Sequence, residues 1–173
     1  MSKTEENLKA AFAGESQARN KYTYWAKVAH KEGYHYIGKI FEETALNKMR
    51  HAQDEFKLLN GIGSTLENLR AAVDGEAFET SDMYPTFAKE AEEEGNKDAA
   101  RLFKQIAKVE EHHRDRYQRL LDMVEAGTVF KRDEPIQWKC SVCGYVVEGK
   151  EPPKKCPCCQ HPMEYYEPAN LNI

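Results

Sequence analysis

Two stretches of the sequence place glutamate and histidine where they could bind metal together. Glu110 and His113 are three residues apart, so on a helix they project from the same face. An ionised carboxylate inside a helical bundle is very costly unless it is paired or bound to a metal. Glu-x-x-His from facing helices, with single glutamates from the others, is how bundles hold two irons or manganeses. Carboxylate oxygens with one imidazole per metal suit these two metals.

Further carboxylates stand at matching distances from two histidines. Glu15 lies 36 residues before His51, and Glu76 and Glu79 lie 37 and 34 residues before His113. A single Glu-x-x-His pair is more often a solvated pair than a metal site, but two matching sets favour metal binding. The candidate residues are the six metal ligands Glu15, His51, Glu76, Glu79, Glu110 and His113, with Tyr22 and Tyr84 on faces from which they could approach the same centre.

Lys48 interrupts the pattern, because it lies three residues before His51, where the second stretch has Glu110. A protonated ammonium cannot ligate a metal and would repel one. The sequence leaves three alternatives. The site keeps two metals with one bridge lost, or it holds one metal or none with Lys48 paired to Glu15, Glu79 or Glu110. Alternatively, Lys48 is a natural or engineered lesion in an otherwise normal enzyme. We expect an altered or impaired two-metal site.

A second kind of metal chemistry is expected near the C-terminus. All five cysteines lie between Cys140 and Cys159, and four of them form two C-x-x-C pairs with 12 residues between Cys143 and Cys156. Two such pairs at short separation indicate tetrahedral binding of iron or zinc. Cys158 is surplus and is interpreted as a bystander. Trp138, Tyr145 and Val146 are expected to form a small core around the site, whose predicted ligands are Cys140, Cys143, Cys156 and Cys159.

Long helices must position the glutamates and histidines. Four helical segments are predicted, over residues 4–32, 36–59, 64–95 and 97–125, the third with a break around "SDMYP". Residues 26–51 repeat as 88–113, with eight of 26 pairs identical, including His51 with His113. Two similar hairpins predict a mainly α fold, a four-helix bundle with pseudo-twofold symmetry. We expect this domain over residues 1–133 and a small β and loop module over residues 134–173.

Composition excludes several classes of function. The chain has 173 residues and a net charge of −4, which gives no electrostatic reason to expect nucleic acid. No apolar run approaches the length needed to cross a membrane, and the polar start "MSKTEENLKA" does not resemble a secretory signal. We expect a cytoplasmic protein, whose clustered cysteines favour metal over disulfides.

The combination of motifs closely resembles the rubrerythrin family. It includes "FAGES", "GEAFE", "MYP" and "VEEHH" in the helical part and "CSVCG" and "CPCC" in the tail, and it covers essentially the whole chain. The resemblance implies a ferritin-like bundle with a carboxylate-bridged di-iron centre, followed by a rubredoxin-like Fe(Cys)4 domain. In that pattern Glu79 can release its iron while His51 takes its place on reduction. A glutamate that bridges both irons belongs at the position of Lys48.

The resemblance also implies a function, which is reduction of hydrogen peroxide to water in oxidative-stress defence. Electrons would come from NAD(P)H through a reductase or rubredoxin and would enter at the four-cysteine site. Family members are typically homodimers or larger, and exchange of hairpins between subunits is left open. Two rivals remain at this point: a ferritin-like iron-storage or ferroxidase protein, and a metal-free bundle that carries a structural zinc ribbon.

Overall fold

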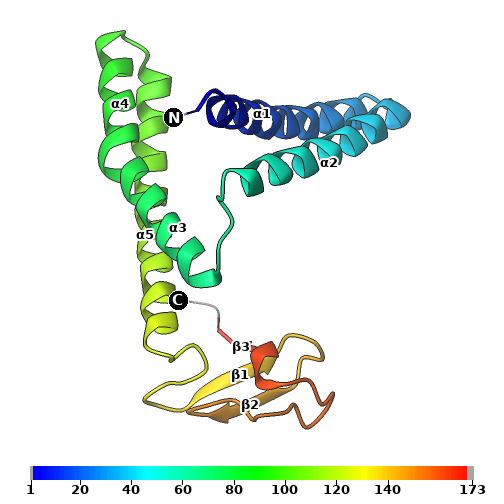
Figure 1. The fold of residues 1–173 in the computed structure, drawn as a ribbon, viewed down its shortest axis with the longest axis vertical. Helices are drawn as coiled ribbons and strands as arrows, with labels where there is room; N and C mark the ends of the chain where they lie inside the picture. The colour runs from blue at the N-terminus through cyan, green and yellow to red at the C-terminus, as the bar shows by residue number, and fades with distance from the viewer. Residues whose placement is uncertain (1, 171–173) are drawn as a thin grey trace. The chain divides into compact units, whose positions relative to one another are not determined.

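The computed structural model describes residues 2–170, which fall into two compact units that divide between Gly63 and Ser64. The first unit is a hairpin of two long helices, α1 (Lys3–Lys31) and α2 (His35–Leu58), coloured blue and cyan in Figure 1. Ser2 caps the start of α1 by accepting a hydrogen bond from the Glu5 N–H. Gly33 ends the helix with a φ of 87°, a conformation that glycine adopts without strain.

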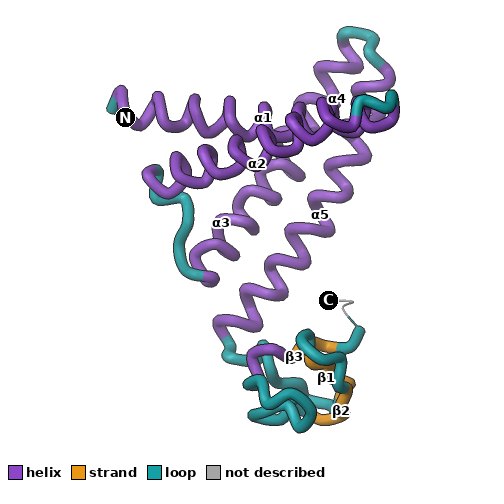
Figure 2. Tube along the Cα trace, turned by 90° about the vertical axis from the view of Figure 1, so that its right-hand side faces the viewer, coloured by secondary structure: helices purple, strands orange, loops and turns teal. Residues whose placement is uncertain are grey.

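The second unit begins with another helical hairpin. Its first arm consists of α3 (Thr65–Phe78), the π-helical segment η1 (Glu79–Met83) and α4 (Tyr84–Glu93), and its second arm is α5 (Lys97–Glu125). Ser64 and Glu67 form the predicted capping box at the start of α3. The break predicted around "SDMYP" is therefore a π-helical turn that keeps the arm continuous (Figure 2).

A repeated cluster of aromatic rings lies between the arms of each hairpin. In the first, the Tyr22 ring lies 5.3 Å from that of Trp25 and 5.9 Å from that of Phe41. In the second, the Phe103 ring lies 6.1 Å from that of Tyr84 and 5.7 Å from that of Phe87. The two trios follow the same offset as the sequence repeat, which confirms that the hairpins are structural copies.

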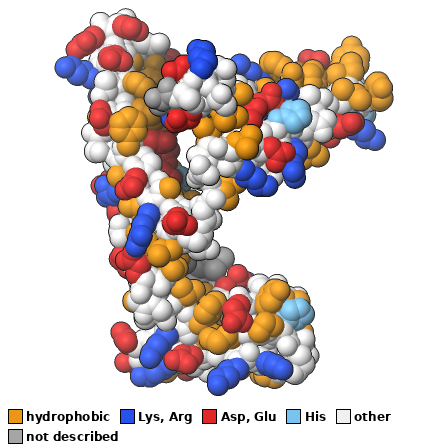
Figure 3. Space-filling model, viewed as in Figure 1, with side chains coloured by type: hydrophobic (Ala, Val, Ile, Leu, Met, Phe, Trp, Pro, Cys, Tyr) orange, Lys and Arg blue, Asp and Glu red, His pale blue; other side chains and the backbone are white. Residues whose placement is uncertain are grey.

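The fully buried helical side chains are mostly small. Ala26, Ala29, Ala45 and Ala52 are buried in the first hairpin, and the second buries three alanines and Leu121. Larger apolar side chains stay in contact with solvent: Trp25 is 47 % and Val28 52 % exposed. Figure 3 shows hydrophobic side chains gathered toward the end of the α1–α2 hairpin. Alanine lets paired helices approach closely, and each hairpin keeps apolar surface that its own two arms do not cover.

The chain ends in a three-stranded antiparallel sheet in the order β2-β1-β3, formed by β1 (Ile136–Cys140), β2 (Val146–Gly149) and β3 (Tyr166–Pro168). The predicted fold class is confirmed in that the protein is mainly helical, with a small three-stranded module. The predicted boundary at residues 133/134 falls in the loop between α5 and β1. Every helix within residues 2–170 is too short or too polar to cross a lipid bilayer.

Candidate metal centres

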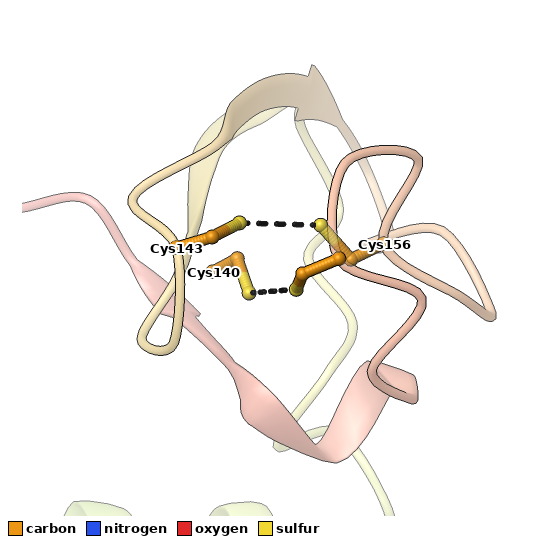
Figure 4. Close-up of side chains that lie close together, drawn as sticks. Cys140, Cys143 and Cys156 are labelled. Carbon is orange, nitrogen blue, oxygen red and sulfur yellow. Dashed lines mark hydrogen bonds between the residues drawn. The ribbon is translucent and has the colours of Figure 1, made fainter.

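The four cysteines predicted as ligands come together at one end of the module. The Sγ atoms of Cys140 and Cys159 lie 3.7 Å apart, and those of Cys143 and Cys156 lie 3.6 Å apart (Figure 4). These distances are far too long for a disulfide. They match the edge of a tetrahedron of sulfurs about 2.3 Å from a central metal, which is about 3.8 Å. The donor set therefore fits an Fe(Cys)4 or Zn(Cys)4 site, and Cys158 lies outside it.

The core of the module differs in part from the predicted one. Trp138 is fully buried as predicted, and Tyr166 is 4 % exposed. Tyr145 and Val146, by contrast, are 38 % and 46 % exposed, so the expectation that they form the core was wrong. For Val146 the reason is the alternation of side chains along a strand: Val147, next to it in β2, packs against the core instead. Tyr145 precedes the strand.

A second cluster of ligand atoms lies in the α3–α5 hairpin. Glu76 on α3 and Glu110 and His113 on α5 each offer an atom, and these atoms all lie within 4.8 Å of one another. The His113 Nδ1 is 2.6 Å from Glu110 Oε2 and 3.9 Å from Glu76 Oε1. Two carboxylates and one imidazole are a donor set that suits iron or manganese. Their spacing fits a single cation held among them.

Burial and charge make this cluster electrostatically crowded. Burial raises the pKa of Glu76, and the neighbouring Glu110 carboxylate raises it further. The pKa of Tyr84 is likewise raised by burial and then by the charges of Glu79 and Glu110. A cation bound between neighbouring carboxylates stabilises their ionised form, which burial and mutual repulsion disfavour. The hairpin thus presents a site with an excess of negative charge.

Glu79 occupies a special place in the backbone, because it opens the π-helical segment η1. Such turns occur frequently at functional sites, since the extra residue changes the direction of the side chains that follow. The structure places Glu79 near enough to affect Tyr84 and Glu76 electrostatically. It is not one of the residues whose atoms cluster with His113.

The α1–α2 hairpin brings together Glu15, Lys48 and His51. The Lys48 Nζ donates to Glu15 Oε1 at 2.8 Å, and the His51 Nδ1 lies 3.1 Å from the other oxygen, Oε2. The hydrogen bond from Lys48 lowers the pKa of Glu15 and raises that of Lys48. Here the carboxylate is neutralised by an ammonium. Of the three partners that the sequence leaves open for Lys48, Glu15 lies in the same hairpin and pairs with it.

A polar cluster that the sequence analysis did not predict links the two arms of the first hairpin near their turn. The His30 Nδ1 lies 3.2 Å from the His35 Nδ1, and the His30 Nε2 lies 3.1 Å from Glu42 Oε1. The imidazole of His30 lies against Gly38, where a Cβ atom would be only 2.6 Å from the ring. The glycine at position 38, which leaves room for the ring, was the signal available in the sequence.

Comparisons with known proteins match both the helical part and the cysteine-containing module. The family model described as Rubrerythrin matches residues 6–121, and the model described as Rubrerythrin, rubredoxin-like domain matches residues 138–167. A rubrerythrin of Porphyromonas gingivalis is 52 % identical over 99 % of this chain and 92 % of its own. Rubrerythrin-1 of Clostridium acetobutylicum is 49 % identical over 98 % of this chain and 96 % of its own. A structure of partially reduced nigerythrin is 36 % identical and covers 97 % of this chain and 87 % of its own, with a TM-score of 0.38.

Proposed function

The chain belongs to the rubrerythrin family, and from that premise we propose that it is a non-haem di-iron peroxidase that reduces hydrogen peroxide to water. The observation that carries the proposal is the pairing of a four-cysteine site with a carboxylate–histidine cluster in one chain. Four thiolates suit a one-electron iron site. Carboxylates with imidazole suit iron that acts on oxygen species.

We assign six residues to the di-iron centre, three of which already cluster. The chemistry that bound iron supplies there is two-electron reduction of the O–O bond. The carboxylates hold compensating negative charge, and His113 is oriented by its contact with Glu110. The two hairpins supply the assigned ligands: Glu15 and His51 from the first, and Glu76, Glu79, Glu110 and His113 from the second.

We assign the two tyrosines to the supply of protons and hydrogen bonds. Because the pKa of Tyr84 is raised, its hydroxyl stays protonated through the neutral range and remains a donor. Tyr22 occupies the equivalent place in the first hairpin, stacked on Phe41. Each hydroxyl sits on a ring held by aromatic neighbours, which restricts its motion.

Electrons would enter through the four-cysteine site, filled with iron and reduced by rubredoxin or by an NAD(P)H-dependent reductase. We also propose that the protein acts as a homodimer or larger homo-oligomer, because both hairpins expose large apolar side chains that a second copy would cover. The mass of the assembly in solution, measured by light scattering, tests this part independently of activity.

The activity is tested with iron-loaded protein, an NADH-dependent reductase and hydrogen peroxide. Peroxide should disappear together with NADH, well above the rate with an equal amount of free iron. Cys143→Ser, which breaks the four-cysteine site, should remove most of the coupled NADH oxidation. A wild-type rate equal to the free-iron rate would refute the proposal.

Lys48 defines the finer proposal, which is that the centre of this chain is altered and its turnover impaired. The Lys48–Glu15 pair supports it, because it occupies an oxygen that a metal would need. Lys48→Glu should therefore raise peroxide turnover. Unchanged turnover would argue against impairment by Lys48.

The same pair favours one second candidate, a helical domain without metal joined to a structural zinc site. The visible spectrum separates the two functions, because Fe(Cys)4 is red and Zn(Cys)4 is colourless. A colourless protein that holds only zinc after iron loading would support this second candidate.

A further inference from the structure

The repeat allows the two hairpins of this chain to be compared position by position. His51 and His113 occupy equivalent positions, and so do Lys48 and Glu110. Each hairpin also supplies a glutamate from its first arm that approaches its histidine, Glu15 in one and Glu76 in the other. The principal difference among these ligand positions is therefore an ammonium in place of a carboxylate.

In the second hairpin, the two carboxylates face each other and their basic neighbour is an imidazole, not a lysine or arginine. Glu76 and Glu110 converge on His113, and their side chains are only 20 % and 15 % exposed. Across residues 2–170, neither carboxylate forms an ion pair with a lysine or arginine. Half-buried carboxylates in this state are stabilised by a bound cation. Glu76, Glu110 and His113 therefore form a group that a bound metal ion would stabilise.

In the first hairpin, the cation is already part of the chain. Lys48 Nζ is 2.8 Å from one oxygen of Glu15, and His51 Nδ1 is 3.1 Å from the other, so both oxygens have partners. The side chains of Glu15 and Lys48 are 21 % and 26 % exposed, which shields the pair from water. An ammonium has three donors and no lone pair to offer a metal while it is charged. A divalent ion at this place would be repelled by it and would lack the carboxylate that position 48 should supply.

We infer that the helical part of this chain holds one metal ion, on Glu76, Glu110 and His113, and that the Lys48 ammonium takes the place of the second. The inference uses the second-hairpin ligands assigned under the proposed function, and it specifies how the centre proposed there is altered: only one of its two irons is bound in this chain. It does not depend on peroxidase activity. It makes the two hairpins unequal: one binds metal, and the other is closed by an internal ion pair.

Metal content per chain tests the inference directly. Protein is loaded anaerobically with ferrous iron and desalted, and total iron plus zinc is measured against protein from amino-acid analysis. The wild type should hold two metals, one in the four-cysteine site and one in the helices. Lys48→Glu should hold three. Lys57→Glu makes the same charge change on the same helix, where the Lys57 Nζ lies 4.0 Å from Asp54 Oδ1, and should stay at two.

Two further variants locate the single helical metal. His113→Ala should lower the count from two to one, whereas His51→Ala at the equivalent position should leave it at two. Both side chains are partly exposed, 42 % and 57 %, so truncation should preserve the helical circular dichroism.

Three results would overturn the inference. They are three metals in the wild type, a loss in His51→Ala equal to that in His113→Ala, and no gain in Lys48→Glu beyond that in Lys57→Glu. The first leaves the proposed peroxidase intact, because it restores the full di-iron centre. A wild type with one metal, confined to the cysteines, removes both proposals.

Discussion

At the scale of single residues, the chain holds two carboxylates in opposite electrostatic states. Glu15 is ion-paired with Lys48, and this hydrogen bond lowers its pKa. Glu76 lies among other carboxylates, and burial raises its pKa. The difference follows from one side chain, because position 48 carries an ammonium where its repeat carries the carboxylate of Glu110. An ammonium can satisfy a carboxylate without metal, whereas a second carboxylate cannot.

This contrast predicts a pH-dependent effect of Lys48→Met on the metal-free protein. A carboxyl group with a lowered pKa adds stability above its ordinary pKa of 4.5, and that stability is lost as the pH falls through the lower value in the folded state. The wild type should therefore exceed Lys48→Met in Tm at pH 7, and the difference should shrink at about pH 3.5. Thermal melts followed by circular dichroism measure both values. A difference that stays constant between the two pH values would contradict the coupling of Glu15 to Lys48.

At the scale of elements, local signals determine where the helices begin and end. The capping box at Ser64 begins α3 where the sequence predicts a helix start. The predicted helix ends lie at glycines 33, 95 and 127, which all have positive φ. The π-helical turn at Glu79–Met83 lies between the turn of α3 that carries Glu76 and the first turn of α4, which carries Tyr84. The arms of the hairpins then pack through alanines, and contacts such as His30 with Gly38 bring them close together.

The close contact at Gly38 predicts the cost of adding one methyl group. Gly38→Ala would place a Cβ atom 2.6 Å from the His30 ring, so we expect a loss of stability. It should be about 1–3 kcal/mol, as for other overpacked sites. In a His30→Ala background the same change should be neutral or stabilising, because alanine favours a helix over glycine. Chemical denaturation of the four proteins gives the coupling energy. Equal costs in both backgrounds would show that the imidazole is not the obstacle.

At the scale of the whole molecule, two kinds of forces hold different parts of the chain together. The helical hairpins are stabilised by packing between their two long arms. The module over residues 134–173, which we propose as a separate domain, has a core of only a few buried side chains around its cysteines. A core of this size generally needs a metal to fold, because the metal supplies the missing free energy.

Loss of the four-cysteine metal should therefore unfold the module and leave the helices intact. In limited proteolysis, Cys143→Ser should lose about one metal per chain and become sensitive to cleavage from residue 136 onward, with unchanged helical circular dichroism. Cys158→Ser is the matched control and should behave as the wild type, because its Sγ lies outside the cluster. Protection of the module in Cys143→Ser would show that its core is stable without the complete site.

The sequence by itself determined the features that depend on neighbours in the chain. Helix ends follow from caps and glycines, the two hairpins from the repeat, and the four-cysteine site from its spacing. Each of these signals lies within a few residues or in a segment that the chain repeats. Tertiary structure alone decided which atoms meet across helices and strands. It paired Lys48 with Glu15, gathered Glu76 but not Glu79 beside His113, joined His30 to Glu42, and turned Val147 rather than Val146 inward. These outcomes depend on the register of one packed element against another, because a shift of a single residue there presents a different side chain.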